Sequence, residues 1–117
     1  MQSSTPIVLI ADPLAPEAEQ ELGGGVDIRR VAGTRRQDLL RAVRDADALI
    51  VRSATTVDRE VVDAAERLKI IGRAGVGVDN IDVEAATERG IIVANTPTAN
   101  IHSACEHAIA LLLAAAR

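Results

Sequence analysis

The amino-acid sequence predicts an α/β fold built on a parallel, doubly wound sheet. Short runs rich in Val and Ile recur along the 117 residues, which is typical of strands that are buried on both faces. These runs lie roughly a dozen and a half residues apart, which leaves room for a crossover helix and two loops. The segments between the runs carry apolar residues at helical spacing. The alternation is the pattern of repeated β-α units.

Each element has an expected place in the chain. We expect strands at Ile7–Ala11, Val26–Val31, Ala48–Val51, Lys69–Ile71 and Ile91–Ala94. We expect helices at Pro16–Leu22, Arg35–Asp45, Val57–Arg67 and Val83–Arg89. The third of these helices has Thr56 as its expected N-cap, and the fourth has either Asn80 or Asp82. Because parallel crossovers are right-handed, few topologies remain. We favour a flavodoxin-like five-stranded sheet with strand order 2-1-3-4-5.

The last segment, Ile101–Arg117, predicts a long apolar helix. Only His102, Glu106 and His107 mark a polar side of it, and helices of this kind are buried or lie at an interface. We therefore divide the chain into an α/β domain, residues 1–100, and a C-terminal helix, residues 101–117. We expect this helix to take part in a homo-oligomer.

Composition excludes several classes of protein. The chain has no Phe, Tyr or Trp and a net charge of -4, which argues against nucleic acid as a partner. Its uncharged stretches are too short to span a bilayer, and its first residues do not resemble a signal peptide. The one cysteine, Cys105, excludes an internal disulfide, so we expect a cytoplasmic protein. His102 and Cys105 share a helix face but do not make a zinc site, and no residue has a convincing catalytic role.

Polar residues follow the predicted strands at the edge where ligands bind in open α/β sheets. These positions are Asp12, Arg52, Arg73–Gly77 and Asn95–Pro97. Strands three and four are neighbours in the expected order, so Arg52 and Arg73 would emerge on one edge, with their strands roughly 4.8 Å apart.

Two guanidinium groups at one edge favour a site for a small anion. The planar fork of arginine binds carboxylate or phosphate bidentately, and the N–H groups of Ser53, Gly75 and Gly77 would lie nearby. The alternative is that each arginine pairs with a surface acid, such as Asp12, Asp58 or Asp79.

The glycine-rich segment Ile70–Asp82 resembles a dinucleotide-binding loop only in part. That loop requires G-x-G-x-x-G after the first strand of a βαβ unit, with an acid about 20 residues later. Here Asn80 stands in place of the third glycine, the loop follows the fourth strand, and position 95 is Asn. We therefore expect either an anion-binding loop or a simple tight turn, in which Asp79 could bond to the loop backbone.

The stretches VRSATTV and KIIGRAGVGVDNIDVEAATERGIIVANTPTAN resemble the N-terminal part of the D-3-phosphoglycerate dehydrogenases, in the D-isomer-specific 2-hydroxyacid dehydrogenase family. The resemblance implies a flavodoxin-like substrate domain and a separate Rossmann domain that binds NAD. It also implies that some residues of this chain contact the substrate and that one residue borders the nicotinamide of the cofactor. The implied contacts to the anionic groups of the substrate are Arg52, Ser53, Arg73, Gly75 and Gly77, and the implied cofactor neighbour is Val76.

The reaction that the resemblance implies is oxidation of 3-phospho-D-glycerate to 3-phosphohydroxypyruvate with NAD, in L-serine biosynthesis. The nucleotide loop, the histidine, its partner acid and the catalytic arginine of that family are not among these residues. We therefore expect the isolated chain to be inactive. The last helix would lead into the Rossmann domain and contribute to a dimer interface.

Three alternatives remain at this stage. One is a fragment of a glyoxylate or hydroxypyruvate reductase, and another is a non-catalytic oligomerisation module built on the last helix. The third is a phosphoacceptor receiver domain, which needs an aspartate after strand three and a lysine after strand five. The chain has Arg52 and Asn95-Thr96-Pro97 at those positions.

Overall fold

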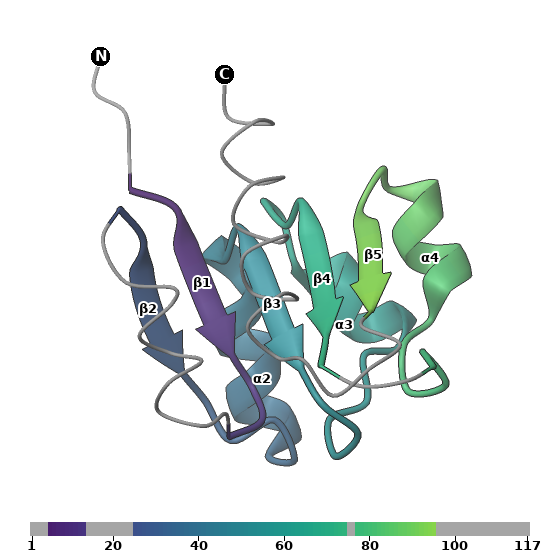
Figure 1. Ribbon diagram of the computed structural model, residues 1–117, viewed down its shortest axis with the longest axis horizontal. Coiled ribbons are helices and arrows are strands. Elements are labelled where there is room, and N and C mark those ends of the chain that lie inside the picture. Colours follow the sequence, from purple (N-terminus) through teal and green to yellow (C-terminus); the bar gives the residue numbers. More distant parts are fainter. Residues whose placement is uncertain (1–4, 14–24, 75–76, 96–117) are drawn as a thin grey trace.

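The computed structural model describes residues 5–13, 25–74 and 77–95, which build a five-stranded parallel sheet with helices packed on it (Figure 1). The strands are β1 (Ile7–Ile10), β2 (Asp27–Arg30), β3 (Ala48–Val51), β4 (Ile70–Arg73) and β5 (Ile92–Asn95). Their order is β2-β1-β3-β4-β5, and every neighbouring pair is parallel. The predicted flavodoxin-like order is thereby confirmed.

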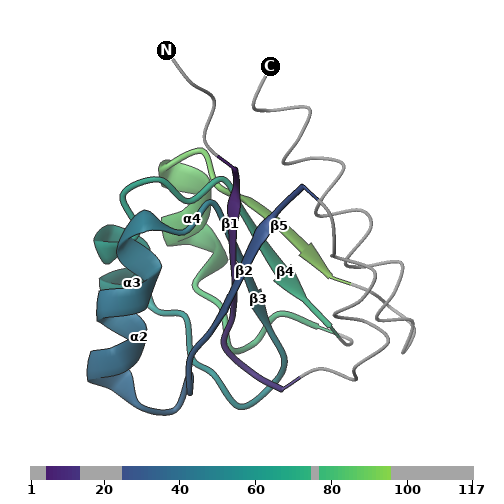
Figure 2. The same ribbon diagram turned by 90° about the vertical axis from the view of Figure 1, so that its left-hand side faces the viewer.

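The helices of the described part are α2 (Arg36–Ala42), α3 (Arg59–Ala64) and α4 (Val83–Glu88), and a 3-10 turn, η1 (Val43–Asp45), continues α2. All three helices lie on the same face of the sheet (Figure 2). They occupy the predicted positions but are shorter than predicted. The helices expected at Pro16–Leu22 and Ile101–Arg117 lie outside the described residues.

The N-terminus of α3 differs from the prediction. Asp58, not Thr56, is the N-cap, and its Oδ1 accepts a hydrogen bond from the Val61 N–H at 3.2 Å. The reason is a parallel bridge between Val57 and Ile81, which holds Val57 extended. A helix can therefore begin only after that residue. In α4 the N-cap is Asp82, one of the two expected candidates, and it accepts from the Ala85 N–H at 2.9 Å.

The sheet is buried on both faces at its centre. All four residues of β3 are buried, whereas the edge strands β2 and β5 are partly exposed. Leu9, Leu49 and Ile71 belong to a cluster with apolar residues of the helices. Their neighbours in the strands, such as Ile50 and Ile70, are buried as well. Burial on both faces explains why the strand sequences are continuous apolar runs rather than alternating ones.

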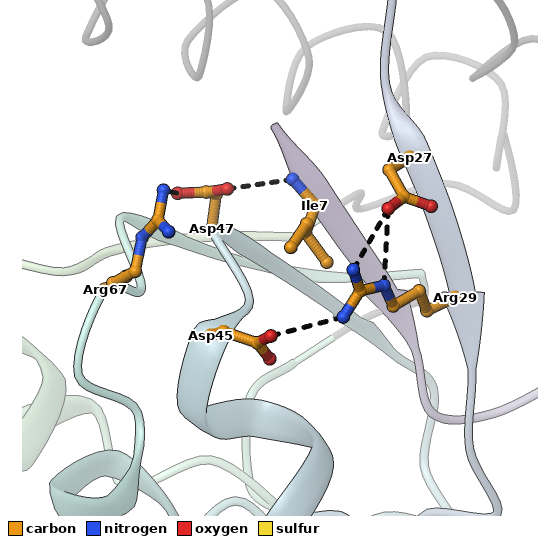
Figure 3. A network of polar contacts seen from close by, with 6 residues as sticks. All are labelled: Ile7, Asp27, Arg29, Asp45, Asp47 and Arg67. Carbon is orange, nitrogen blue, oxygen red and sulfur yellow. Dashed lines mark hydrogen bonds and ion pairs between the residues drawn. The ribbon is translucent and has the colours of Figure 1, made fainter. Parts of the chain in front are cut away.

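Opposite the strand ends that carry Arg52 and Arg73, a polar network joins the starts of the strands (Figure 3). The Asp47 carboxylate is buried and accepts from the Ile7 N–H at 2.8 Å and from Arg67 Nη2 at 3.4 Å. The carbonyl oxygen of Asp47 accepts from the Lys69 N–H at 2.9 Å. Asp47 thus aligns the starts of β1, β3 and β4. The nearby Arg29 pairs are exposed and add little stability.

An ion pair at the start of α3 predicts a pH-dependent stability. Arg36 Nη2 lies 2.5 and 2.7 Å from the two carboxylate oxygens of Asp58. Hydrogen bonding to Arg36, more than any other contact, lowers the pKa of Asp58. Because this pKa is lower in the folded state, the ion pair stabilises the fold at pH values above the pKa that Asp58 has in the unfolded chain. That stabilisation is lost as the pH falls through the pKa of the folded state.

We expect Asp58→Asn, which can still cap the helix, to lower the free energy of unfolding by less than about 1 kcal/mol at neutral pH. The difference from the wild type should vanish as the pH falls from about 5 to below 4. Urea denaturation at low salt across this range measures it. The control is Asp63→Asn, an exposed acid of the same helix. A difference that persists undiminished at pH 3 would contradict the assignment.

Candidate anion-binding site

The structure brings Arg52 and Arg73 to the same end of neighbouring strands, as the sequence predicts. Arg73 is the last residue of β4 and pairs in register with Val51 of β3 and with Asn95 of β5. Arg52 directly follows Val51. The strands all point to the lower edge of the sheet in Figure 1, so both arginines emerge there.

Neutral groups of the following loop hold the side chain of Arg73, which is half-buried. Its Nε donates to Asn80 Oδ1 at 2.7 Å, and its Nη1 donates to the carbonyl oxygen of Gly77 at 3.1 Å. Gly77 has a φ of 85°, a left-handed conformation that glycine adopts without the strain of a Cβ. The predicted site residues Gly75 and Val76 lie outside the described residues.

Arg52 is held through its backbone, whereas its guanidinium is exposed. The Arg52 N–H donates to Asp12 Oδ2 at 2.6 Å, and the Arg52 carbonyl oxygen accepts from Asn80 Nδ2 at 2.6 Å. Within residues 5–13, 25–74 and 77–95, the guanidinium itself forms no hydrogen bond or ion pair. Ser53 is exposed next to it.

The acids that were alternative partners for the two arginines are engaged elsewhere or exposed. Asp12 binds backbone and hydroxyl donors, and Asp58 binds Arg36. Asp79 is exposed and makes no side-chain hydrogen bond in the described part of the chain, so the prediction that it holds the loop backbone is wrong. Within the described residues, Asp12 and Asp58 therefore do not form ion pairs with Arg52 or Arg73.

Asp12 fixes the turn after β3 from one side. Asp12 is only 4% exposed. Besides the Arg52 N–H, it accepts from the Thr55 N–H at 3.2 Å and from Thr55 Oγ1 at 2.6 Å. Thr55 is fully buried, so each of these polar groups needs a partner inside the protein.

Gly33 supports the same turn from the loop after β2. A Cβ at this position would lie 1.9 Å from Thr55 Oγ1 and 2.9 Å from the carbonyl oxygen of Ala11. Only glycine lets this loop approach so closely. A hollow of about 400 Å³ opens beside Gly33, at the ends of β1 and β2. Neither Arg52 nor Arg73 lines it, so it lies next to the arginines without including them.

Sequence reasoning did not identify the roles of Asn80, Thr55 and Gly33. Asn80 is noticeable in the sequence as the residue that interrupts the glycine fingerprint, and its amide is both a donor and an acceptor. That chemistry is a signal for a bridging role. Thr55 and Gly33 carry no comparable signal, because their contact joins positions far apart in the chain.

Neither metal-binding nor membrane-spanning features occur in the part of the chain that the structure describes. No group of three His, Cys, Asp or Glu side chains there could hold a metal ion. None of the helices in these ranges is long and apolar enough to cross a membrane.

Known proteins resemble this chain in both sequence and fold. A D-3-phosphoglycerate dehydrogenase of Mycobacterium tuberculosis is 64% identical over 114 residues, which make up 97% of this chain and 22% of the relative. The NAD⁺-bound 3-phosphoglycerate dehydrogenase of Entamoeba histolytica is 34% identical with a TM-score of 0.68, covering 80% of this chain and 33% of that one. A glyoxylate reductase from Paecilomyes thermophila is 28% identical with a TM-score of 0.71, covering 81% and 33%.

The chain spans about a fifth of the length of the curated relatives that it matches. Residues 8–114 match the family model of the D-isomer specific 2-hydroxyacid dehydrogenase, catalytic domain. Because this match covers nearly all of the sequence, the chain belongs to the D-isomer specific 2-hydroxyacid dehydrogenase family.

Proposed function

We propose that residues 1–117 form the substrate-binding portion of an NAD-dependent D-3-phosphoglycerate dehydrogenase. The reaction is oxidation of 3-phospho-D-glycerate to 3-phosphohydroxypyruvate, in L-serine biosynthesis. The observation that carries the proposal is the placement of Arg52 and Arg73 at the ends of neighbouring strands, while Asp12 and Asp58 bond to other groups. The 64% identity to the mycobacterial dehydrogenase supports the phosphorylated substrate.

The chemistry of the substrate matches this arrangement. It carries a carboxylate and a phosphate, and an arginine can bind either group bidentately. In the proposal Arg52 and Arg73 neutralise these groups, and Ser53, Gly75 and Gly77 contribute hydrogen bonds. The glycines allow backbone N–H groups to approach the anion closely.

The described residues do not fit the pyrophosphate of NAD. A dinucleotide loop offers a bare helix N-terminus to the pyrophosphate. Here the N-terminus of α4 is capped by the Asp82 carboxylate, which would repel an anion. The Asn80 side chain fills the place of the third glycine. We therefore propose that a Rossmann domain outside residues 1–117 holds NAD, and that Val76 borders the nicotinamide.

Two parts of this proposal concern residues beyond the described ranges. Residues 1–100 act as the substrate-binding domain, and residues 101–117 form the helix that leads into the Rossmann domain. That helix also contributes to a homo-oligomer. The support for both parts is the family match, which extends to residue 114.

The test is catalysis by a full-length dehydrogenase that carries this segment. One such protein is the mycobacterial enzyme with its corresponding segment replaced by residues 1–117. In the reductive direction, we expect kcat/KM to favour 3-phosphohydroxypyruvate over glyoxylate and hydroxypyruvate by at least about 100-fold, because a site built for a phosphate leaves polar groups unpaired without it.

Three results would contradict the proposal. A preference for glyoxylate or hydroxypyruvate would favour the reductase alternative. Oxidation of 3-phosphoglycerate with NAD by the purified 117-residue chain would show that no further domain is needed. A dimer whose affinity depends on concentration but not on Arg52 or Arg73, in a protein without turnover, would favour the oligomerisation module.

A further inference from the structure

We propose that Asn80 is a positioning residue that fixes Arg52 and Arg73 relative to each other in a single anion site. The inference rests on the proposed function. In the proposed function, Asn80 touches neither a cofactor nor the reacting atoms. It acts through the two arginines, because its side-chain amide bonds to both the loop after β3 and the side chain of Arg73.

The contacts of the Asn80 side chain reach both loops. Its Nδ2 donates to the carbonyl oxygens of Arg52 and Thr55, at 2.6 and 2.7 Å. Its Oδ1 accepts from Arg73 Nε at 2.7 Å. The orientation of the amide follows from its partners, since the flipped amide would set an oxygen against two carbonyl oxygens. One half-buried side chain thus satisfies groups on both sides of the site.

The backbone places the Asn80 amide where it can make these contacts. The Asn80 carbonyl oxygen accepts from the Val57 N–H at 2.8 Å, and the Val57 carbonyl oxygen accepts from the Asp82 N–H at 2.8 Å. These two bonds join the loop before α3 to the loop before α4. Asn80 therefore cannot move without moving the neighbouring loop.

The turn from Arg52 to Thr55 is held from two sides. Asp12 accepts from its N–H groups, and Asn80 donates to its carbonyl groups. Asn80 also bonds to Arg73, since its Oδ1 accepts from Arg73 Nε. The Asn80 amide consequently adds a side-chain connection between Arg73 and the turn to the backbone bond from the Ala74 N–H to the Val51 carbonyl oxygen, at 2.9 Å.

Pre-organisation explains why this connection matters for binding. A free arginine side chain loses much rotamer freedom when it binds an anion. A bond to Nε fixes the plane of the guanidinium of Arg73 before the ligand arrives, which reduces that cost. Without Asn80, Arg73 would lose the bond to its Nε, and the Arg52 turn would lose the donor to its carbonyl groups. An anion that needs both arginines would then bind more weakly.

The test uses Asn80→Ala in the full-length dehydrogenase that carries this segment. We expect KM for 3-phosphoglycerate to rise about 10- to 100-fold, as for other displaced binding groups, with kcat within about threefold of the wild type. A merely structural role would lower the amount of active enzyme, and hence kcat, at unchanged KM. The control is Asp79→Ala, which removes an exposed neighbour in the same loop and should change KM less than about twofold.

A double variant separates an effect through Arg73 from an independent one. If Asn80 acts through Arg73, the rises in KM caused by Asn80→Ala and Arg73→Ala should not multiply when the two are combined. Should Asn80→Ala fail to fold, Asn80→Asp keeps the size and the acceptor for Arg73 but sets an oxygen against two carbonyl groups. We expect it to raise KM about tenfold.

Three results would overturn the inference: an unchanged KM in the variant that folds, a loss confined to kcat, or rises in KM that multiply in the double variant. A wild type that does not turn over 3-phosphoglycerate would instead overturn the proposed function, and the inference with it. An active wild type with an unaffected Asn80 variant would overturn the inference alone.

Discussion

Arg73→Ala in the full-length dehydrogenase should raise KM for 3-phosphoglycerate about 100-fold, which corresponds to about 2.7 kcal/mol of lost binding. The variant removes a half-buried guanidinium that two neutral groups of the loop hold in place. Losing one partner of a buried, hydrogen-bonded charge pair has a cost in this range. Arg52→Ala should have a smaller effect, about 30-fold, because Arg52 is exposed and solvent screens its charge.

Steady-state kinetics with 3-phosphoglycerate as the varied substrate measure both effects. The matched control is Arg41→Ala, since Arg41 is exposed on α2, far from the strand ends, and it should leave KM unchanged. Arg73→Lys keeps the charge but loses the planar fork, so it should recover only part of the affinity. Unchanged kinetics in both Arg52→Ala and Arg73→Ala would refute a substrate site at this edge.

Asp12→Ala should lower the free energy of unfolding of the chain by about 3 kcal/mol, because it leaves buried donors without an acceptor. Three donors lose their partner: the N–H groups of Arg52 and Thr55 and the hydroxyl of Thr55. Two of them belong to a residue that is fully buried. Water cannot replace the carboxylate there without opening the turn.

Urea denaturation of the wild type and the variant measures this loss. Thr55→Val is the matched variant, because it removes one donor and nearly preserves the side-chain shape. It should cost about 1 kcal/mol, since one hydrogen bond is lost and Asp12 keeps its other two donors. If Asp12→Ala were as stable as the wild type, the carboxylate would not be the acceptor that holds this turn.

The strands and their order could be predicted because they follow from local pattern and general topology. The run Ala48–Val51 is bounded by Asp47 and Arg52, and β3 has these same bounds. In β4 the apolar run ends at Ile71, yet the strand continues to Arg73. Gly72 and Arg73 lack the apolar signal but pair with both neighbouring strands. A strand end set by pairing rather than by burial is not visible in the sequence.

The positions of the two arginines could be predicted for the same reason, whereas their surroundings could not. Asn80 reaches carbonyl groups that lie 25 and 28 residues earlier in the chain, and no periodicity reports such a contact. The sequence places Asp12 at a strand end but does not distinguish a partner of a guanidinium from a partner of the backbone. The structure decides this, because the Asp12 carboxylate is buried beneath the turn.

In the proposed function, Arg52 and Arg73 bind one molecule of substrate together. A crystal structure of the full-length dehydrogenase with 3-phosphoglycerate tests it most directly. We predict that both guanidinium groups lie within about 3 Å of carboxylate or phosphate oxygens of the same molecule. A substrate bound away from the carboxyl end of the sheet, with both guanidinium groups in solvent, would show that the two arginines do not form the substrate site.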